Sequence, residues 1–559
     1  MKIGMTKHIE AILFDMGGTL RFTVKKDTAE KEVAIRQIIE LLGADAPVDE
    51  FAKLLKAHSK AYKSWAEQTL IELNEEELWT QWMLPEWPAE KIRPIAIQLN
   101  EMYRNAFGKY FIFPDTYEVV LELYRRGYRL GLVSNTTSSV EVPNVLNDLR
   151  LTGCFEVVIL SAVVGKRKPD PDILLSAAER MGISPEKCAY IGNQPKKDVA
   201  AARKAGFSMT AIIRDPDKQP DIHDDDPLLV PDQVIGNLKD LLKIFPIRKP
   251  AQPGHRYNAS LSTMWSIGKF PTLADFFEFA RRTGFTRIEL NHKVNSAMLE
   301  GINLGNYSFS SIHEPCPADI PAEILAKQDW LVSSLNEQCR QEGVKAIQRS
   351  IDLAHSLRAS TIIVHVGHIP LNISLEKQLY KLVKSGERNS DEYLDIQGQM
   401  IDARVKLADL GMESIKKSLL ELLVYASRFK IRLGVENRSH FREYPSPDEL
   451  ETLLGLGKPD QLGFIYDVGH AQQLSRLGFY PHDEWLKRFS TRIIGIHLHD
   501  VCGLNDHFAA GLGDVDFKKI STYLPENAVR TCEFDVMNTP EQVKSGLKFL
   551  FEHGCINVI

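Results

Sequence analysis

The segments IRLGVENR (431–438), LGFIYDVGH (462–470) and IIGIHLHD (493–500) decide the fold of the second half of the chain. Each segment is a short apolar run that ends in a carboxylate or an imidazole, and each run is typical of a buried parallel strand. The segments begin about 30 residues apart, which is the length of one strand–helix unit in a (β/α)8 barrel. The carboxyl ends of barrel strands form one rim, so we expect these polar side chains to meet there.

Five further apolar runs complete a set of eight strand candidates. The candidates are 261–266, 286–290, 309–313, 361–366, 431–436, 462–467, 493–498 and 529–534. We therefore predict that residues 259–559 form a (β/α)8 TIM barrel. An extra charged segment, about 371–415, is predicted to be a helical insertion after the fourth strand. It either shapes the pocket or lies outside the barrel as a solvated helix.

Metal-type side chains stand at the ends of these strands or in the loops that follow them. They are His313, His365, Glu436, Asp467, His470, His497, His507 and Glu533. Imidazoles and carboxylates are the ligands that Zn²⁺ and Mn²⁺ take from proteins. Such groups crowded on one rim would cost several kcal/mol unless a cation neutralised them. We therefore predict a Zn²⁺ or Mn²⁺ site.

The motifs GVEN, DVGH, HLHD and the loop GLNDHFAAGLGD resemble the xylose-isomerase-like barrel superfamily, which includes endonuclease IV and sugar-phosphate isomerases and epimerases. Resemblance to the one-metal isomerases implies that Glu436 and Glu533 hold the metal and transfer the proton, with Asp467 and His497 as further ligands. Resemblance to endonuclease IV implies three zinc ions. Its additional ligands match His313, His365, His470 and His507, with Asp506 nearby. Asp506 and His507 are adjacent here, whereas the family places one residue between them.

The number of candidate ligands favours a multi-metal site, since one ion needs about four and clusters of ions suit phosphoester cleavage. We predict hydrolysis of a phosphoester in a phosphorylated, sugar-containing small molecule. Single-metal sugar-phosphate isomerisation or epimerisation is the alternative, and a non-catalytic binding protein is the second. Arg438 and Asp506 are predicted to contact substrate, Arg438 through its fork of donors. Four flanking residues either orient ligands or cap helices: His368, His499, Asp500 and Asn437.

Residues 8–245 are predicted to form a separate Rossmann-like α/β domain. Apolar runs such as AILFD, YRLGLVSN and KCAYIGN alternate with helix-like segments, which indicates a parallel sheet wrapped by helices. Residues about 25–110 have helical periodicity and are predicted to form a cap. Prolines 246, 250 and 253 with Gly254 mark a linker over 246–258.

The motif ILFDMGGTL resembles the first motif of the haloacid dehalogenase superfamily of phosphohydrolases. The resemblance implies that Asp15 is the catalytic nucleophile and that Asp198 binds Mg²⁺. It also implies that Ser134, Asn135 and Lys168 bind the phosphoryl group. Two positions depart from the family. Gly17 occupies the position of the family's general acid/base, and Asn193 occupies the position of the first metal-binding acid of the fourth motif. Loss of the acid/base costs about 10²–10⁴-fold in rate, and loss of one carboxylate at Asn193 weakens the Mg²⁺ site. We therefore expect doubtful activity.

Composition limits the partners and the compartment. The chain has 559 residues, a net charge of −6 and seven cysteines without a CxxC pair. An acidic chain argues against a nucleic-acid partner, and scattered cysteines fit a reducing cytoplasm. The N-terminus does not resemble a signal peptide, and no apolar run reaches the ~20 residues of a membrane span. We expect a cytoplasmic protein; the sequence gives no oligomeric state.

Overall fold

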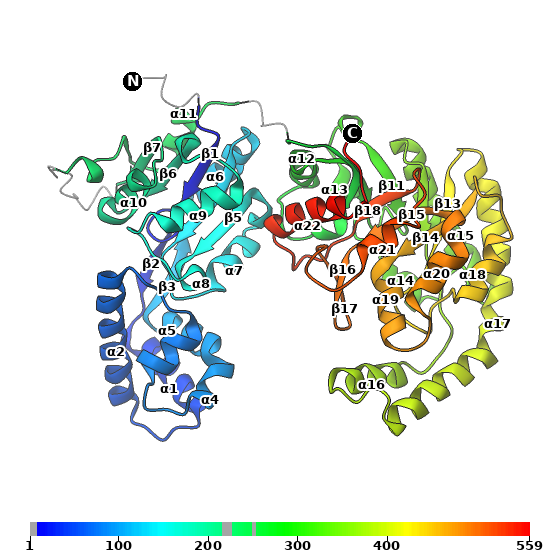
Figure 1. Cartoon of the computed structure of the whole chain (residues 1–559), viewed down its shortest axis with the longest axis horizontal. Coiled ribbons are helices and arrows are strands. Elements are labelled where there is room, and N and C mark those ends of the chain that lie inside the picture. Colours follow the sequence, from blue (N-terminus) through cyan, green and yellow to red (C-terminus); the bar gives the residue numbers. More distant parts are fainter. Residues whose placement is uncertain (1–7, 215–225, 249–252) are drawn as a thin grey trace. The chain divides into compact units, whose positions relative to one another are not determined.

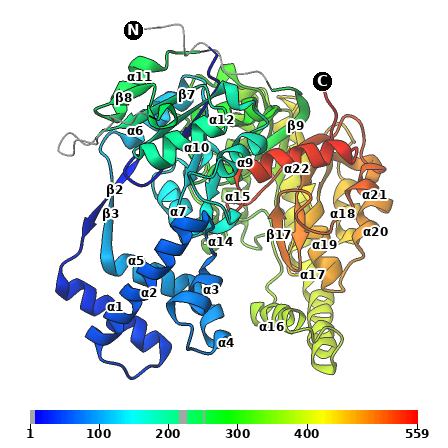
Figure 2. The ribbon, with the colours of Figure 1, turned by 60° about the vertical axis from the view of Figure 1, so that its left-hand side comes forward.

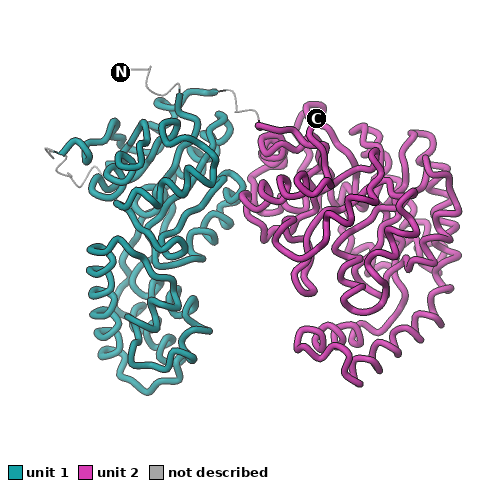
Figure 3. Tube along the Cα trace, in the orientation of Figure 1, with its two compact units in different colours: residues 1–251 teal, residues 252–559 magenta. Residues whose placement is uncertain are grey.

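The computed structural model describes residues 8–214, 226–248 and 253–559. The chain divides into two compact units, Met1–Ala251 and Gln252–Ile559, which Figure 3 colours separately. Each unit has its own sheet and its own set of buried apolar side chains. The division falls inside the proline-rich segment 246–258.

The first unit is built on a parallel six-stranded sheet in the order β5-β4-β1-β6-β7-β8 (Figure 1). The strands are β1 Ala11–Phe14, β4 Arg129–Ser134, β5 Phe155–Leu160, β6 Cys188–Gly192, β7 Met209–Ile213 and β8 Gln233–Ile235. Helices α9 (Asp172–Met181) and α10 (Ala200–Lys204) bury their apolar side chains against one face of this sheet. Buried strands of this kind read as continuous apolar runs, which made them visible in the sequence.

A helical cap is connected to this sheet by an antiparallel ribbon of β2 (Arg21–Lys25) and β3 (Gly108–Ile112), as Figures 1 and 2 show. Its helices are α1 Thr28–Leu42, α2 Val48–Thr69, α3 Glu75–Leu78, α4 Ala89–Ile92 and α5 Ala96–Phe107. They share a separate apolar core centred on Trp79 and Leu55. Glu72 of the cap pairs with Arg167 at 3.2 Å, beside Lys168 on the sheet's loops.

The second unit is a closed barrel of eight parallel strands, which confirms the predicted TIM barrel. The strand order is β10-β11-β12-β13-β14-β15-β18-β9. The strands are β9 Tyr257–Ser262, β10 Phe285–Leu290, β11 Phe309–His313, β12 Thr361–Val364, β13 Arg432–Glu436, β14 Leu462–Asp467, β15 Ile493–Leu498 and β18 Val529–Cys532. The first strand was predicted at 261–266, which was wrong: β9 begins at Tyr257, and residues 263–266 form a 3-10 turn.

Two helices occupy the predicted insertion, α16 (Ile373–Lys384) and the first part of α17 (Asp391–Ser427). Their apolar side chains pack with Phe441, Phe479 and Leu504, which lie in loops on the side of the barrel where the strands end. Glu376 of α16 also accepts a hydrogen bond from the backbone N–H of Phe441 at 3.0 Å. The insertion therefore contacts the loops that border the candidate site.

Helix α17 bends between its first part, which carries the insertion, and its second part, which covers the barrel (Figure 1). Near the middle of α17, the Tyr444 hydroxyl donates a hydrogen bond to the carbonyl of Ala408 at 2.6 Å. A Cβ on Gly411 would lie only 2.8 Å from that hydroxyl. A side chain inserted into the helical ladder is a common cause of such a bend. Neither α17 nor any other helix in the described ranges combines the length and apolar character of a membrane span.

Candidate active sites

Four acidic and imidazole side chains converge at the centre of the barrel rim. Nδ1 of His497 lies 2.7 Å from Glu436 Oε1, 2.9 Å from Glu533 Oε2 and 3.3 Å from Asp467 Oδ2. Each residue stands at the end of a different strand or directly after it. One ligand atom from each lies within 4.8 Å of the others. Parallel strands of similar length therefore bring together side chains that are about 100 residues apart in sequence.

The charges in this group fit a bound cation. Burial disfavours a charged imidazole, yet the carboxylates of Glu533, Glu289 and Glu436 raise the pKa of His497 well above its ordinary value. A proton on His497 thus offsets part of the negative charge of the cluster, and a divalent cation held by the same atoms would offset more. Within the described chain, Glu436 Oε1 and both ring nitrogens of His497 have no well-formed hydrogen bond. Three carboxylates and one imidazole match the donors of Zn²⁺ or Mn²⁺ sites.

A second group lies on the neighbouring strands and shares Glu436. It consists of His313 at the end of β11, His365 after β12, and Glu436. Nε2 of His365 is 2.7 Å from Glu436 Oε2 and 2.6 Å from Arg438 Nη1. One nitrogen cannot both donate to the carboxylate and accept from the guanidinium. A cation between His365 and Glu436 would satisfy both lone pairs, so these residues also fit a metal.

A third group contains His470, Asp506 and His507. His470 lies in α19 (Val468–Arg476), and the other two lie in the hairpin strand β17 (Asn505–Phe508). The ring nitrogens Nδ1 of His470 and His507 contact the carbonyls of Asn437 and Glu533 at 2.9 and 3.0 Å. Each ring therefore keeps Nε2 available for a ligand. Asp506, predicted to contact substrate, lies in this metal-type group.

The hydrogen bonds of Asp467 and His499 fix the DVGH and HLHD segments. Oδ1 of Asp467 accepts from the backbone N–H of His470 at 2.7 Å and so caps α19. Nε2 of His499 lies 3.0 Å from the same carboxylate, and its Nδ1 accepts from the N–H of His507 at 2.9 Å. Burial would lower the pKa of His499, but Asp467 raises it to about 9. His499 thus connects the central group to the hairpin, while Asn437 hydrogen-bonds the backbone of Asp467.

The sequence analysis missed two site residues on the second barrel strand and its loop. Glu289 of β10 is completely buried, and its Oε2 lies 3.5 Å from Nε2 of His497. His292 follows the same strand, with its ring 5.3 Å from that of His313. Burial lowers the pKa of His292 to about 4, so its imidazole is neutral near pH 7. Glu289 is the penultimate residue of β10, and the strand ends in the apolar Leu290.

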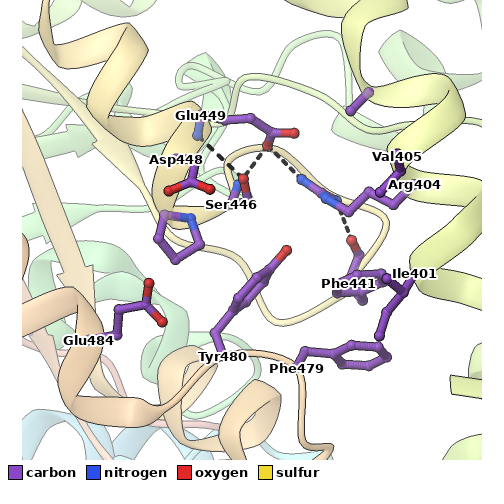
Figure 4. A pocket seen from close by; sticks show the side chains of 12 residues that line it. Ile401, Arg404, Val405, Phe441, Ser446, Asp448, Glu449, Phe479, Tyr480 and Glu484 are labelled. Atoms are coloured by element: carbon purple, nitrogen blue, oxygen red, sulfur yellow. Dashed lines mark hydrogen bonds and ion pairs between the residues drawn. The ribbon is translucent and has the colours of Figure 1, made fainter. Parts of the chain in front are cut away.

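The insertion clamps the loop that carries Arg438. Arg404 of α17 donates to the carbonyls of Phe441 and Glu443 and pairs with Glu449 at 2.5 Å. Glu443 in turn lies 3.5 Å from Arg438, which pairs with Glu436 at 2.7 Å. Figure 4 shows Arg404 extending from α17 toward this loop, at the wall of a cavity of about 320 Å³. The insertion thus fixes the guanidinium group of Arg438 beside the candidate metal site.

Removal of this clamp is expected to destabilise the barrel unit. The substitution Arg404→Met removes the charged partner of the Glu449 carboxylate, which keeps only its hydrogen bond from the Ser446 N–H, and the Arg404 donors to two carbonyls. It should lower the free energy of unfolding by about 3 kcal/mol. Lys416→Met in the same helix is the control, because Lys416 pairs with an exposed carboxylate and should change stability by less than about 0.5 kcal/mol. Calorimetry of the full chain measures both. Equal stability of the two variants would contradict the claim that the contacts of Arg404 stabilise the barrel unit.

The N-terminal candidate site is centred on Lys168. Its Nζ lies 2.6 Å from Asp15 Oδ1, 2.8 Å from Asp198 Oδ1 and 2.6 Å from the Tyr190 hydroxyl. Asn135 exchanges two hydrogen bonds of 2.9 Å with the backbone of Lys168 and so positions its loop. Ser134 is the last residue of β4 and is buried beside this loop. The structure thus brings Asp15, Lys168 and Asp198, three of the predicted site residues, into contact.

Both departures from the phosphatase pattern lie at this site. A Cβ on Gly17 would meet nothing within 4 Å, so the position has room for a side chain. Oδ1 of Asn193 is buried without a hydrogen bond in the described chain, whereas its backbone N–H donates to Asp198 at 3.0 Å. Burial raises the pKa of Asp15 to about 6 despite the opposing charge of Lys168. The ammonium of Lys168 contacts both remaining carboxylates, Asp15 and Asp198.

Comparison with known proteins identifies both units. Residues 9–206 match the family model of haloacid dehalogenase-like hydrolases, and residues 277–553 match that of the xylose isomerase-like TIM barrel. The chain therefore joins a haloacid dehalogenase-like hydrolase domain to a xylose isomerase-like TIM barrel. The α/β fold class predicted from the sequence is confirmed in both halves.

Curated relatives of the first unit are named as phosphatases. A glyceraldehyde 3-phosphate phosphatase of Methanopyrus kandleri is 27% identical over 237 residues, which cover 42% of this chain and 97% of that protein. A phosphoserine phosphatase of Thermus thermophilus is 27% identical over 242 residues, covering 38% and 94%. Among solved structures, a D-tagatose 3-epimerase-like protein aligns with 20% identity and a TM-score of 0.38, covering 53% of this chain and 96% of that one. The two family models and the phosphatase relatives support an enzyme.

Proposed function

We propose that the barrel is a divalent-metal-dependent enzyme that hydrolyses a phosphoester in a phosphorylated, sugar-containing small molecule. The observation that carries the proposal is the sharing of Glu436 between two groups of metal-type side chains, with a third group beside them. A one-ion site needs only the central group. In such a site four histidines would bind no metal: His313, His365, His470 and His507. Clustered Zn²⁺ or Mn²⁺ ions, when bound, activate water and neutralise charge on phosphoester oxygens.

The protein side chains have separate roles in this proposal. Glu436, Glu533 and Asp467 hold cations through carboxylate oxygens, and the histidines complete each group. Arg438 is close to the site and partly accessible, so its planar donors suit the non-bridging oxygens of a phosphoester. Substrate binding would draw Arg438 from Glu436 toward the phosphate. The phosphatase names of the relatives of the first unit favour a phosphorylated substrate.

The alternative is a single-metal sugar-phosphate isomerase or epimerase. It is favoured by the central group, where Glu436 and Glu533 both lie within 2.9 Å of Nδ1 of His497. Two carboxylates facing each other across a bound substrate can remove and return a proton. The isomerase-like family model of the barrel also supports this alternative.

Metal content separates the two functions. The full chain, loaded with Zn²⁺ or Mn²⁺ and desalted, is expected to retain two or three ions per chain by elemental analysis, and to cleave bis(p-nitrophenyl) phosphate. His313→Ala is expected to lose one ion and most of this cleavage. A single retained ion, unchanged in His313→Ala, would instead support isomerisation. Asp15→Asn is the control for cleavage at the first unit and should leave bis-ester turnover unchanged.

A further inference from the structure

Glu289 is a buried carboxylate at the centre of the barrel that the proposed metal groups do not use. It belongs to β10, on the far side of His497 from the three carboxylates of the central group. Its Oε2 accepts hydrogen bonds from the Ser311 hydroxyl at 2.7 Å and the Thr531 hydroxyl at 3.1 Å. Its Oε1 is buried and without a partner in the described chain. A buried charge with so few partners costs stability, so a purely structural role is a poor account of it.

The position of Glu289 decides which nitrogen of His497 carries the proton. Oε2 of Glu289 lies 3.5 Å from Nε2 of His497. Nδ1 faces Glu436, Asp467 and Glu533 instead. The space lined by Glu289, His497 and Thr531 admits no water molecule, so Glu289 faces Nε2 without a water between them, at a distance longer than a well-formed hydrogen bond. A neutral imidazole has one donor and one acceptor nitrogen, and a proton on Nε2 leaves the Nδ1 lone pair facing the central group.

We propose that Glu289 is a positioning residue that holds His497 with Nε2–H toward itself and Nδ1 toward the metal. The inference rests on the proposed metal site. It goes beyond that site because it makes part of the metal affinity of the central group depend on Glu289, which is not itself a ligand. Carboxylates behind ligating histidines typically contribute 10–100-fold in metal affinity. Ser311 and Thr531 hold the carboxylate in place from the two strands β11 and β18.

The test compares metal affinity in the wild type and Glu289→Gln. The full chain is stripped of metal and titrated with Zn²⁺ against a chromogenic chelator, and with Co²⁺ by visible absorption. Glu289→Gln keeps the shape of the side chain and removes its charge, so we expect affinity at one site to fall about 10–100-fold with an altered Co²⁺ spectrum. The melting temperature of the metal-free variant should stay equal to or above that of the wild type. The double variant Ser311→Ala/Thr531→Val, which frees the carboxylate without removing it, should lose about 3-fold.

Each outcome decides between the two proposals. Wild-type protein that binds no Zn²⁺ or Co²⁺ would overturn both the metal site and the role of Glu289. Wild-type protein that binds metal, together with unchanged affinity in Glu289→Gln, would overturn the role of Glu289 alone. A variant that melts at lower temperature without metal but binds with wild-type affinity would show that Glu289 is only structural. If Glu289→Gln does not fold, the double variant decides: unchanged affinity there overturns the proposal.

Discussion

Glu436→Gln is expected to remove two of the three candidate metal groups with one substitution. Oε1 of Glu436 lies 2.7 Å from His497, and Oε2 lies 2.7 Å from His365. Each oxygen therefore faces a different group of candidate ligands. An amide presents one neutral oxygen and one N–H₂ donor, which repels a cation and cannot serve both groups. The affinity loss should exceed the 10–100-fold that follows removal of a residue behind a ligand.

The measurement is elemental analysis after equilibration with a fixed concentration of free Zn²⁺, followed by bis(p-nitrophenyl) phosphate turnover. Glu436→Gln should retain at most one ion and no measurable bis-ester cleavage. Glu413→Gln is the matched control, because Glu413 lies on the exposed face of α17 and pairs only with Lys416 in the described chain. Equal metal content in the two variants would show that Glu436 does not bridge groups.

Gly17→Asp is expected to raise phosphatase activity at the first unit by about 10²–10⁴-fold, the usual contribution of a general acid/base. The position has room, since a Cβ there meets nothing within 4 Å, and Gly17 does not have the positive φ that its neighbour Gly18 has. Asp15, the predicted nucleophile, and the ammonium of Lys168 already lie 2.6 Å apart. The new carboxylate would therefore complete a set of groups that the chain has kept.

Hydrolysis of p-nitrophenyl phosphate with Mg²⁺ measures this gain. Burial raises the pKa of Asp15 to about 6, and a nucleophile must be ionised, so the gained activity should increase as the pH rises through about 6. Gly17→Asn has the same size without an ionisable group and should give no gain. If Gly17→Asp and the double variant Gly17→Asp/Asn193→Asp both fold and stay inactive, the unit has lost more than its acid/base and its metal ligand.

The candidate site was predictable to the extent that it depends on strand ends. His313, Asp467 and His497 each follow an apolar run, and the parallel barrel places the ends of all runs on one rim. Glu289 escaped because it lies inside its strand, where only the completed barrel shows that it faces His497. Strand β9 was misplaced because its sequence, YNASLS, is polar, and its burial comes from neighbouring strands. Arg404 escaped because helical periodicity does not tell which loop a helix contacts.

Helix α17, which carries the insertion, is bound to the loop of Arg438 by a hydrogen bond from Tyr444 to the carbonyl of Ala408. Tyr444 follows directly after Glu443, the partner of Arg438. The direction in which the arm projects and the placement of Arg438 are therefore set by one short stretch of chain. A displacement of the insertion would therefore act on the guanidinium of Arg438 through the neighbouring residues Tyr444 and Glu443.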